Sequence, residues 1–150
     1  MIAPSTLRPL VATLALAACA ALANFDLPPS SADNADAMVA AEALKSGNWQ
    51  QAITGFTAAL KAEPGNADYH NGLGYAYRKS GKLEPSFVHY RQALQINPEL
   101  KSAHEYIGEA YVASGDKAKA REHLAALERL CRGRDCEEYR DLAKAISEAK

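Results

Sequence analysis

The chain has 150 residues and a formal net charge of −1, with basic and acidic side chains interspersed along it. This length fits one domain, and the balanced charge gives no indication of nucleic acid or of an anionic membrane surface as a partner. The alanine-rich composition, with nine glycines and seven prolines, favours helices that stack closely.

The first 23 residues differ from the rest of the chain. Residues 1–9 carry one basic side chain, Arg8, and no acid, and residues 10–18 are apolar apart from Thr13. This pattern is typical of a secretory signal peptide, and the apolar run is too short to span a bilayer as a permanent helix. We therefore predict that the protein leaves the cytoplasm.

Two cleavage sites are compatible with this leader. Ala21-Leu22-Ala23 is an A-x-A site, which would release a protein beginning at Asn24. Leu16-Ala17-Ala18-Cys19 resembles a bacterial lipobox, in which Cys19 would be lipidated and become the new N-terminus. Either product would be periplasmic, free or anchored to a membrane through Cys19. Residues 24–34, with Pro-Pro and Ser-Ser and no apolar periodicity, are predicted to be a linker.

After the linker the sequence repeats with a period of 34 residues. The pairs that correspond across one period are Leu73-Gly74 with Ile107-Gly108, Tyr77 with Tyr111, Ser80-Gly81 with Ser114-Gly115, Phe56 with Tyr90, Ala59 with Ala93 and Pro64 with Pro98. The pattern L-G-x-x-Y, followed by a small residue, an aromatic residue, Ala and Pro, resembles the tetratricopeptide repeat (TPR).

This resemblance implies an all-α fold. The expected architecture is an α-solenoid of three helix-turn-helix repeats at about 33–66, 67–100 and 101–132, closed by a capping helix at 135–149, so that residues 35–150 form one TPR domain. Apolar residues at three- and four-residue steps place the paired helices at 35–46 and 49–63, 67–80 and 83–96, and 101–114 and 117–131.

Acidic residues mark the starts of two of these helices. Asp116 is the expected N-cap of the helix at 117–131. Asp135 and Glu138 form a D-x-x-E pattern similar to a capping box at the start of the last helix.

Cysteine usage agrees with export. The chain has three cysteines, and because Cys19 would be removed or acylated, Cys131 and Cys136 remain. In an oxidising compartment such a pair indicates a structural disulfide, whereas redox motifs and metal sites usually use C-x-x-C spacing. The bond would hold the capping helix to the third repeat.

Four histidines recur with the repeat, His70 with His104 and His89 with His123. A single metal ion needs nitrogens about 2 Å away, whereas equivalent side chains on successive helices extend in parallel from axes about 8–10 Å apart. A shared metal ion is therefore not expected. His70 and His104 stand in the column where the TPR family often has a large aromatic residue, so the resemblance implies that they pack between helices. The chain also lacks a nucleophile elbow, an H-E-x-x-H motif and a phosphate-binding loop, so we predict no enzyme activity, cofactor or metal site.

The TPR resemblance implies a binding groove on the concave side, lined by the first helix of each repeat. The groove residues it implies are Asn34, Ala41 and Lys45 in the first repeat, Asn71, Tyr75, Arg78 and Lys79 in the second, and Glu105, Glu109 and Val112 in the third. Tyr75 and Arg78 are the strongest candidates, because an exposed Tyr beside an Arg can anchor a peptide.

Some TPR proteins use a Lys-Asn-Asn-Lys-Arg set to hold the C-terminal carboxylate of a chaperone. This set is not reproduced here, since Asn71 and Tyr75 stand where its first Lys and Asn would be. The resemblance implies a non-catalytic scaffold or adaptor that binds a protein or peptide in the groove, and the leader places it in the bacterial cell envelope as an expectation. The alternative is a passive structural subunit that self-associates through the outward flank of the first repeat, near Trp49, with the groove unused.

Overall fold

The computed structural model describes residues 34–149, which form seven helices and no strand. The predicted signal peptide, Cys19 and most of the predicted linker lie outside the described residues. The helices are α1 (Ala35–Lys45), α2 (Trp49–Ala62), α3 (Ala67–Lys79), α4 (Leu83–Ile96), α5 (Lys101–Ala113), α6 (Lys117–Leu130) and α7 (Glu137–Glu148). No helix in this range is long and apolar enough to cross a bilayer.

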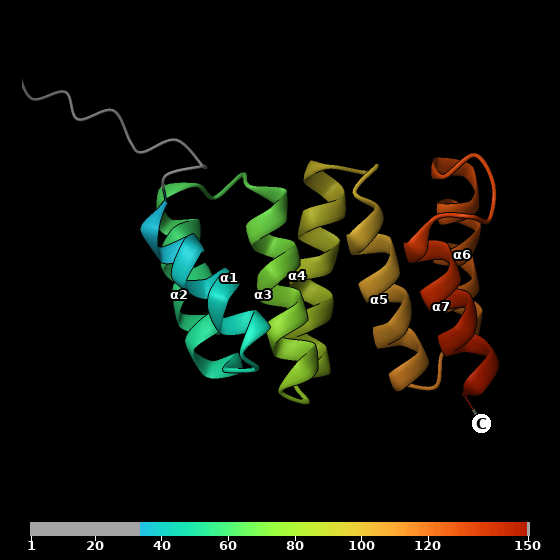
Figure 1. The fold of residues 1–150 in the computed structure, drawn as a ribbon, viewed down its shortest axis with the longest axis horizontal. Coiled ribbons are helices and arrows are strands. Elements are labelled where there is room, and N and C mark those ends of the chain that lie inside the picture. The colour runs from blue at the N-terminus through green and yellow to red at the C-terminus, as the bar shows by residue number, and fades with distance from the viewer. Residues whose placement is uncertain (1–33, 150) are drawn as a thin grey trace, which may run out of the picture.

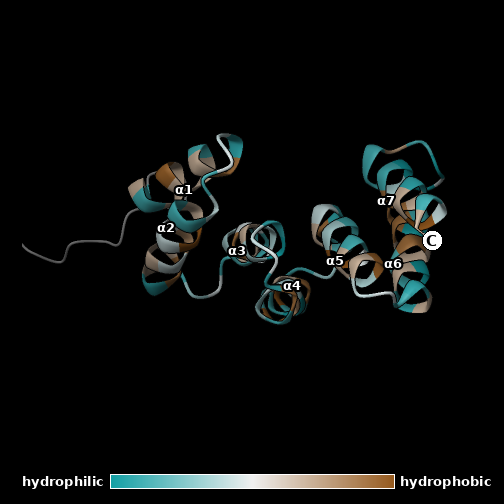
Figure 2. Ribbon diagram, turned by 90° about the horizontal axis from the view of Figure 1, so that it is seen from below, coloured by the Kyte–Doolittle hydropathy of each residue, from teal (hydrophilic) through white to brown (hydrophobic). Residues whose placement is uncertain are grey.

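The helices form a curved row of antiparallel pairs (Figure 1). Each pair packs internally, α1 on α2, α3 on α4 and α5 on α6, and α7 packs against both α5 and α6. Seen from below, α1, α3, α5 and α7 follow the inner side of the curve, and α2, α4 and α6 follow its outer side (Figure 2). The all-α solenoid predicted from the repeat is confirmed.

A glycine at the same repeat position ends the first helix of each pair. Gly47, Gly81 and Gly115 have φ angles of 72°, 80° and 85°, a left-handed conformation that costs other residues energy. Each glycine lets the chain reverse tightly, as in a helix C-cap, so that the second helix returns alongside the first. The 34-residue period is therefore visible in the backbone as well as in the sequence.

The capping helix begins later than predicted. Asp116 is the N-cap of α6, and its carboxylate accepts a hydrogen bond from the backbone N–H of Lys119 at 3.1 Å. The corresponding prediction for Asp135 is wrong, because Cys136 occupies the N-cap position of α7 without a side-chain cap. The chain turns at Arg132, whose φ is 53°, and stays irregular up to the second cysteine.

Small residues let the helices approach closely. A Cβ added at Gly74 would lie 2.7 Å from the ring of Tyr90, which is fully buried. In the third repeat, a Cβ added at Gly108 would lie 2.5 Å from Leu142 of the capping helix. The same repeat position therefore receives a side chain of α4 in the second repeat and of α7 in the third.

Candidate functional site

The inner side of the curve carries a groove whose first half is apolar. This half encloses about 540 Å³ between α1 and α3, with the start of α5 as its far wall. Its lining residues are Ala37, Ala41, Leu44, Lys45, Phe56, Asp68, Tyr69, Asn71, Gly72, Tyr75, Ser102 and Tyr106. Because most of this surface is small or aromatic, it can accommodate an apolar side chain.

Asn71 is the polar centre of the apolar half. Its side chain is buried, and its amide Nδ2 donates a hydrogen bond to Ser102 Oγ at 3.0 Å. Its amide oxygen Oδ1 accepts no hydrogen bond from any residue between 34 and 149. Leaving such an oxygen unpaired costs about 1–3 kcal/mol. Because the atom has almost no solvent-accessible surface, a ligand in the groove cannot reach it while Asn71 keeps this position.

The second half of the groove is acidic. It holds about 460 Å³ between α3, α5 and α7, and it shares Tyr75, Ser102 and Tyr106 with the apolar half, so that the two halves form one continuous groove. Its other lining residues are Arg78, Lys79, Glu105, Glu109, Glu137, Glu138 and Asp141. Five carboxyl groups thus face two basic side chains.

Arg78 is a structural tie between helices. Its Nη2 lies 2.6 Å from Glu109 Oε2, and its side chain is only 15% exposed. Its Nε donates to the hydroxyl of Tyr90 at 3.4 Å, and its guanidinium lies 5.2 Å from the ring centre of Tyr75. Two of its three guanidinium nitrogens, Nε and Nη2, are therefore engaged by α4 and α5, so Arg78 lines the groove as a side chain already paired within the fold.

Aromatic rings line the junction of the two halves. The rings of Tyr75 and Tyr106 lie 4.8 Å apart, and Trp49 meets Tyr75 edge-on at 6.2 Å. Lys79 Nζ lies 5.7 Å from the ring of Trp49. Trp49 therefore belongs to the edge of the groove, and the expectation that it marks the outward flank of the first repeat is wrong.

Glu105 has an unusual environment for a carboxyl group. Burial, followed by the charges of Glu109, Asp141 and Glu138, raises its pKa to about 8, and Arg78 offsets this only partly. Its carboxyl group is therefore largely protonated at neutral pH. A cation arriving in the groove would favour the ionised form, since an opposite charge stabilises a carboxylate.

Most of the predicted groove residues lie together. Asn71, Tyr75, Arg78, Lys79, Glu105 and Glu109 line the groove, as do Ala41 and Lys45. Val112 and Asn34 do not line either half. The side chain of Asn34 instead caps α1 through Ala37 N and donates to Glu63 Oε1 at 3.4 Å.

Sequence reasoning missed two parts of the groove. Ser102 and Tyr106 stand at repeat positions filled by Asp68 and Gly72 one period earlier, and all four line the apolar half. The repeat could have indicated these positions. It could not indicate the carboxylates of α7, because that helix lies outside the 34-residue pattern.

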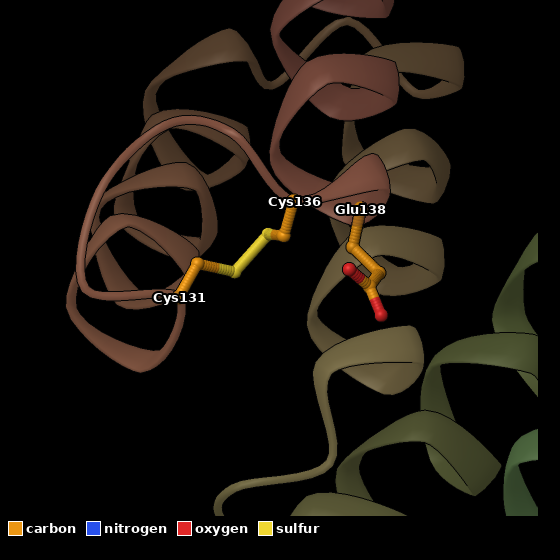
Figure 3. Close-up of side chains that lie close together, drawn as sticks. All are labelled: Cys131, Cys136 and Glu138. Atoms are coloured by element: carbon orange, nitrogen blue, oxygen red, sulfur yellow. A yellow bond between two sulfur atoms is a disulfide. The ribbon is translucent and has the colours of Figure 1, made fainter.

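A disulfide joins Cys131 and Cys136 at the start of α7 (Figure 3). Together with Glu138 these cysteines are the one group of possible metal ligands that lie close together in the described part of the chain. Because the two sulfur atoms are bonded to each other, neither is a thiolate ligand. The bond holds the first turn of α7, from which Glu138 contributes to the acidic half.

The histidines form two equivalent pairs. His70 Nε2 lies 3.1 Å from the carbonyl oxygen of Pro64, and its Nδ1 lies 3.2 Å from Nδ1 of His89. Since a carbonyl only accepts, Nε2 of His70 carries the hydrogen, and Nδ1 of the neutral ring accepts from His89. The pair ties α3 to α4, as expected of a packed His70.

The second pair repeats this geometry one period later. His104 Nε2 lies 2.9 Å from the carbonyl oxygen of Pro98, and the Nδ1 atoms of His104 and His123 are 3.0 Å apart. Burial and the neighbouring His104 lower the pKa of His123 to about 4, and burial and the neighbouring His70 lower the pKa of His89. Pairing across one repeat, 19 residues apart, was not predicted, because the sequence showed only the recurrence between repeats.

Comparison with known proteins supports the repeat and shows the fold. Residues 74–115 match the family model described as TPR repeat, whereas no curated protein matches the chain. Among solved structures, the Arabidopsis OM64 TPR domain is similar with a TM-score of 0.69 and 17% identity, over 75% of this chain and 92% of that chain.

Two further solved structures carry ligands in their titles. The TPR2B domain of yeast Sti1, in a pHsp70 complex, is similar with a TM-score of 0.70 and 18% identity, over 76% of this chain and 92% of that chain. The first TPR of Spaghetti (RPAP3), bound to the HSP90 peptide SRMEEVD, is similar with a TM-score of 0.64 and 20% identity. The match covers 77% of this chain and 97% of that chain. At such identities the likeness shows the TPR solenoid fold.

Proposed function

We propose that this protein is a non-catalytic scaffold that binds an extended polypeptide segment along its groove. The observation that carries the proposal is the continuous groove on the inner side, apolar between α1 and α3 and acidic between α3, α5 and α7. An apolar side chain of an extended segment would occupy the space beside Ala41. The two solved TPR domains whose titles name a pHsp70 complex and a bound HSP90 peptide support this mode of binding by analogy.

The compartment is part of the proposal. The leader pattern supports export to the bacterial periplasm, and a Cys131–Cys136 disulfide suits an oxidising compartment. Metabolic labelling with a fatty acid tests the anchored form. We expect label on the wild type and none on Cys19→Ser, whereas an unlabelled wild type whose N-terminus is Asn24 would establish the free form.

A matched pair of substitutions tests the groove. Ala41→Gln fills the apolar half from an exposed helix position, and Ala125→Gln places the same side chain at an exposed position of α6 on the outer side. We expect Ala41→Gln to weaken capture of polypeptides from an envelope extract about tenfold, and Ala125→Gln to leave it unchanged. Helical circular dichroism should be the same for both variants. Equal capture by all three proteins would contradict groove binding.

Self-association through α1 is the second candidate. Met38 and Val39, on the helix that begins the row, are 64% and 49% exposed, although both are apolar. Sedimentation of the wild type and of Met38→Ser/Val39→Ser tests it. A wild-type dimer that this pair of substitutions dissociates would favour the flank, and a monomer at all concentrations would remove this candidate.

A further inference from the structure

Two rows of groove residues change character from one repeat to the next. Successive periods place Ala37, Asn71 and Glu105 in one row and Ala41, Tyr75 and Glu109 in the other. All six line the groove. Its wall therefore passes from methyl groups, through an amide and a phenol, to carboxyl groups. The capping helix continues this trend, because it adds three further acids to the same half.

The acids of the second half are largely uncompensated. Arg78 is used by Glu109, and Lys79 Nζ lies near the rings of Trp49 and Tyr75 at the junction. Glu105, Glu137, Glu138 and Asp141 form no ion pair with any residue between 34 and 149. Burial and the neighbouring carboxylates also raise the pKa of Glu105, which is the effect expected where like charges converge without a counterion.

We propose that the groove selects polypeptide segments that carry a Lys or Arg about three residues from an aliphatic or aromatic side chain. This inference rests on the proposed function of the groove and adds the chemistry of the ligand. The apolar side chain would lie between α1 and α3, and the cation would face Glu105 and Asp141. The spacing follows from helix axes about 8–10 Å apart and an extended chain of about 3.3 Å per residue.

Such a ligand has the opposite charge to the peptide in one of the similar structures. The HSP90 peptide SRMEEVD, bound to the first TPR of Spaghetti, has three acidic residues and one basic residue. The acidic half of this groove would repel a segment of that composition. Two proteins with the same fold would therefore prefer ligands of opposite charge. The fold determines where the groove lies, and the side chains that line the groove determine its charge.

Three pools of peptides blocked at both ends can test the preference. Each pool fixes one Leu and one second residue three positions away, in both orders, on a Ser and Gly background. The second residue is Arg, Gln or Glu. Binding of each pool to the processed wild-type chain is measured by fluorescence anisotropy at low and high salt. We expect the Arg pool to bind about tenfold tighter than the Gln pool and the Glu pool weakest, with the difference shrinking at high salt.

Charge reversals locate the effect. Glu137→Lys/Asp141→Lys should abolish or invert the preference for Arg, because both positions line the acidic half. Glu84→Lys/Glu122→Lys makes the same change of net charge at exposed positions of α4 and α6, and should leave the preference intact. This control separates local charge from net charge.

Each other outcome overturns the inference in a recognisable way. Tighter binding of the Glu pool, or equal binding of all pools, with loss of binding in Ala41→Gln, would refute the preference and leave the groove function standing. A preference for Arg that both double variants alter equally would make it a property of net charge alone. Failure of every pool to bind, or binding that Ala41→Gln does not change, would remove the proposed function together with this inference.

Discussion

The two ends of the groove are built from the same repeat but held together by different interactions. At the first end, α1 and α2 pack through small residues, so closely that a Cβ at Gly55 would lie 2.8 Å from Ala40. At the other end, an ion pair between Arg78 and Glu109 connects α3 to α5, and the histidine pair connects α5 to α6. A disulfide holds the start of α7. The same repeat architecture is thus stabilised by small-residue packing at one end and by charged, histidine and disulfide contacts at the other. Only the stability of the second end should respond to charge, redox state and pH.

Removal of the Arg78–Glu109 tie should have the largest effect on stability. Arg78→Met leaves Glu109 partly buried beside Glu105, and we expect a loss of about 3 kcal/mol in the free energy of unfolding. Lys45→Met breaks the Lys45–Glu42 pair, whose side chains are 75% and 74% exposed, and should cost less than about 0.5 kcal/mol. Urea unfolding compares the two variants, and equal losses would contradict the difference between the ends.

Opening the disulfide should have a smaller and more local effect. A loop this short contributes roughly 2 kcal/mol on a chain-entropy basis, and the bond holds the start of α7. Reduction should therefore speed hydrogen exchange in α7 and leave α1 and α2 unchanged, with most of the helical signal retained. Before reduction, the intact mass should show the loss of two hydrogens. Free thiols in the exported protein, or exchange that rises equally at both ends, would contradict this prediction.

The histidine pairs should give the smallest effect, through pH. The pKa of His123 falls to about 4 and that of His89 is also lowered from 6.5, so the unfolded chain binds protons more readily than the folded one. The contribution of the two histidines to the free energy of unfolding is therefore complete above about pH 6.5, and it is lost as the pH falls towards 4. Both rings are half-buried and stack on tyrosines, Tyr77 and Tyr111, so screening limits the loss to about 1 kcal/mol.

A variant isolates this effect from other titrations. Glu105 acts in the opposite direction, because its raised pKa favours the folded state at low pH. Unfolding free energies of the wild type and of His89→Gln/His123→Gln, measured from pH 7 to pH 4, share the Glu105 contribution, so their difference reports the histidines. A constant difference across this range would show that the pairs do not titrate. In the first repeat, Asp36 and Gly55 stand at the positions that the paired histidines fill in the later repeats. The first repeat should therefore show no such dependence of stability on pH.

Local sequence signals located the helices well because they act within one or two turns. Glycine at the turns, apolar residues at helical steps and Asp116 as a cap placed six helices to within a residue or so of their observed ends. The prediction for α7 was poorer, because its start depends on the disulfide and on the turn at Arg132 and not on Asp135. Where a disulfide determines the start of a helix, the spacing of acidic residues in the sequence does not predict which residue is the N-cap.

By itself, the sequence determined the solenoid, because a 34-residue period of small and large residues stacks in one way, and it indicated which helices face the groove. Only the tertiary structure decided what those residues do there. It made Arg78 a structural tie, moved Trp49 to the groove edge, and left the oxygen of Asn71 without a partner. It also joined the acids of α7 to those of α5. These outcomes depend on contacts between helices that are far apart in the chain. The periodicity of the sequence does not specify the distances between those helices or the burial of their side chains.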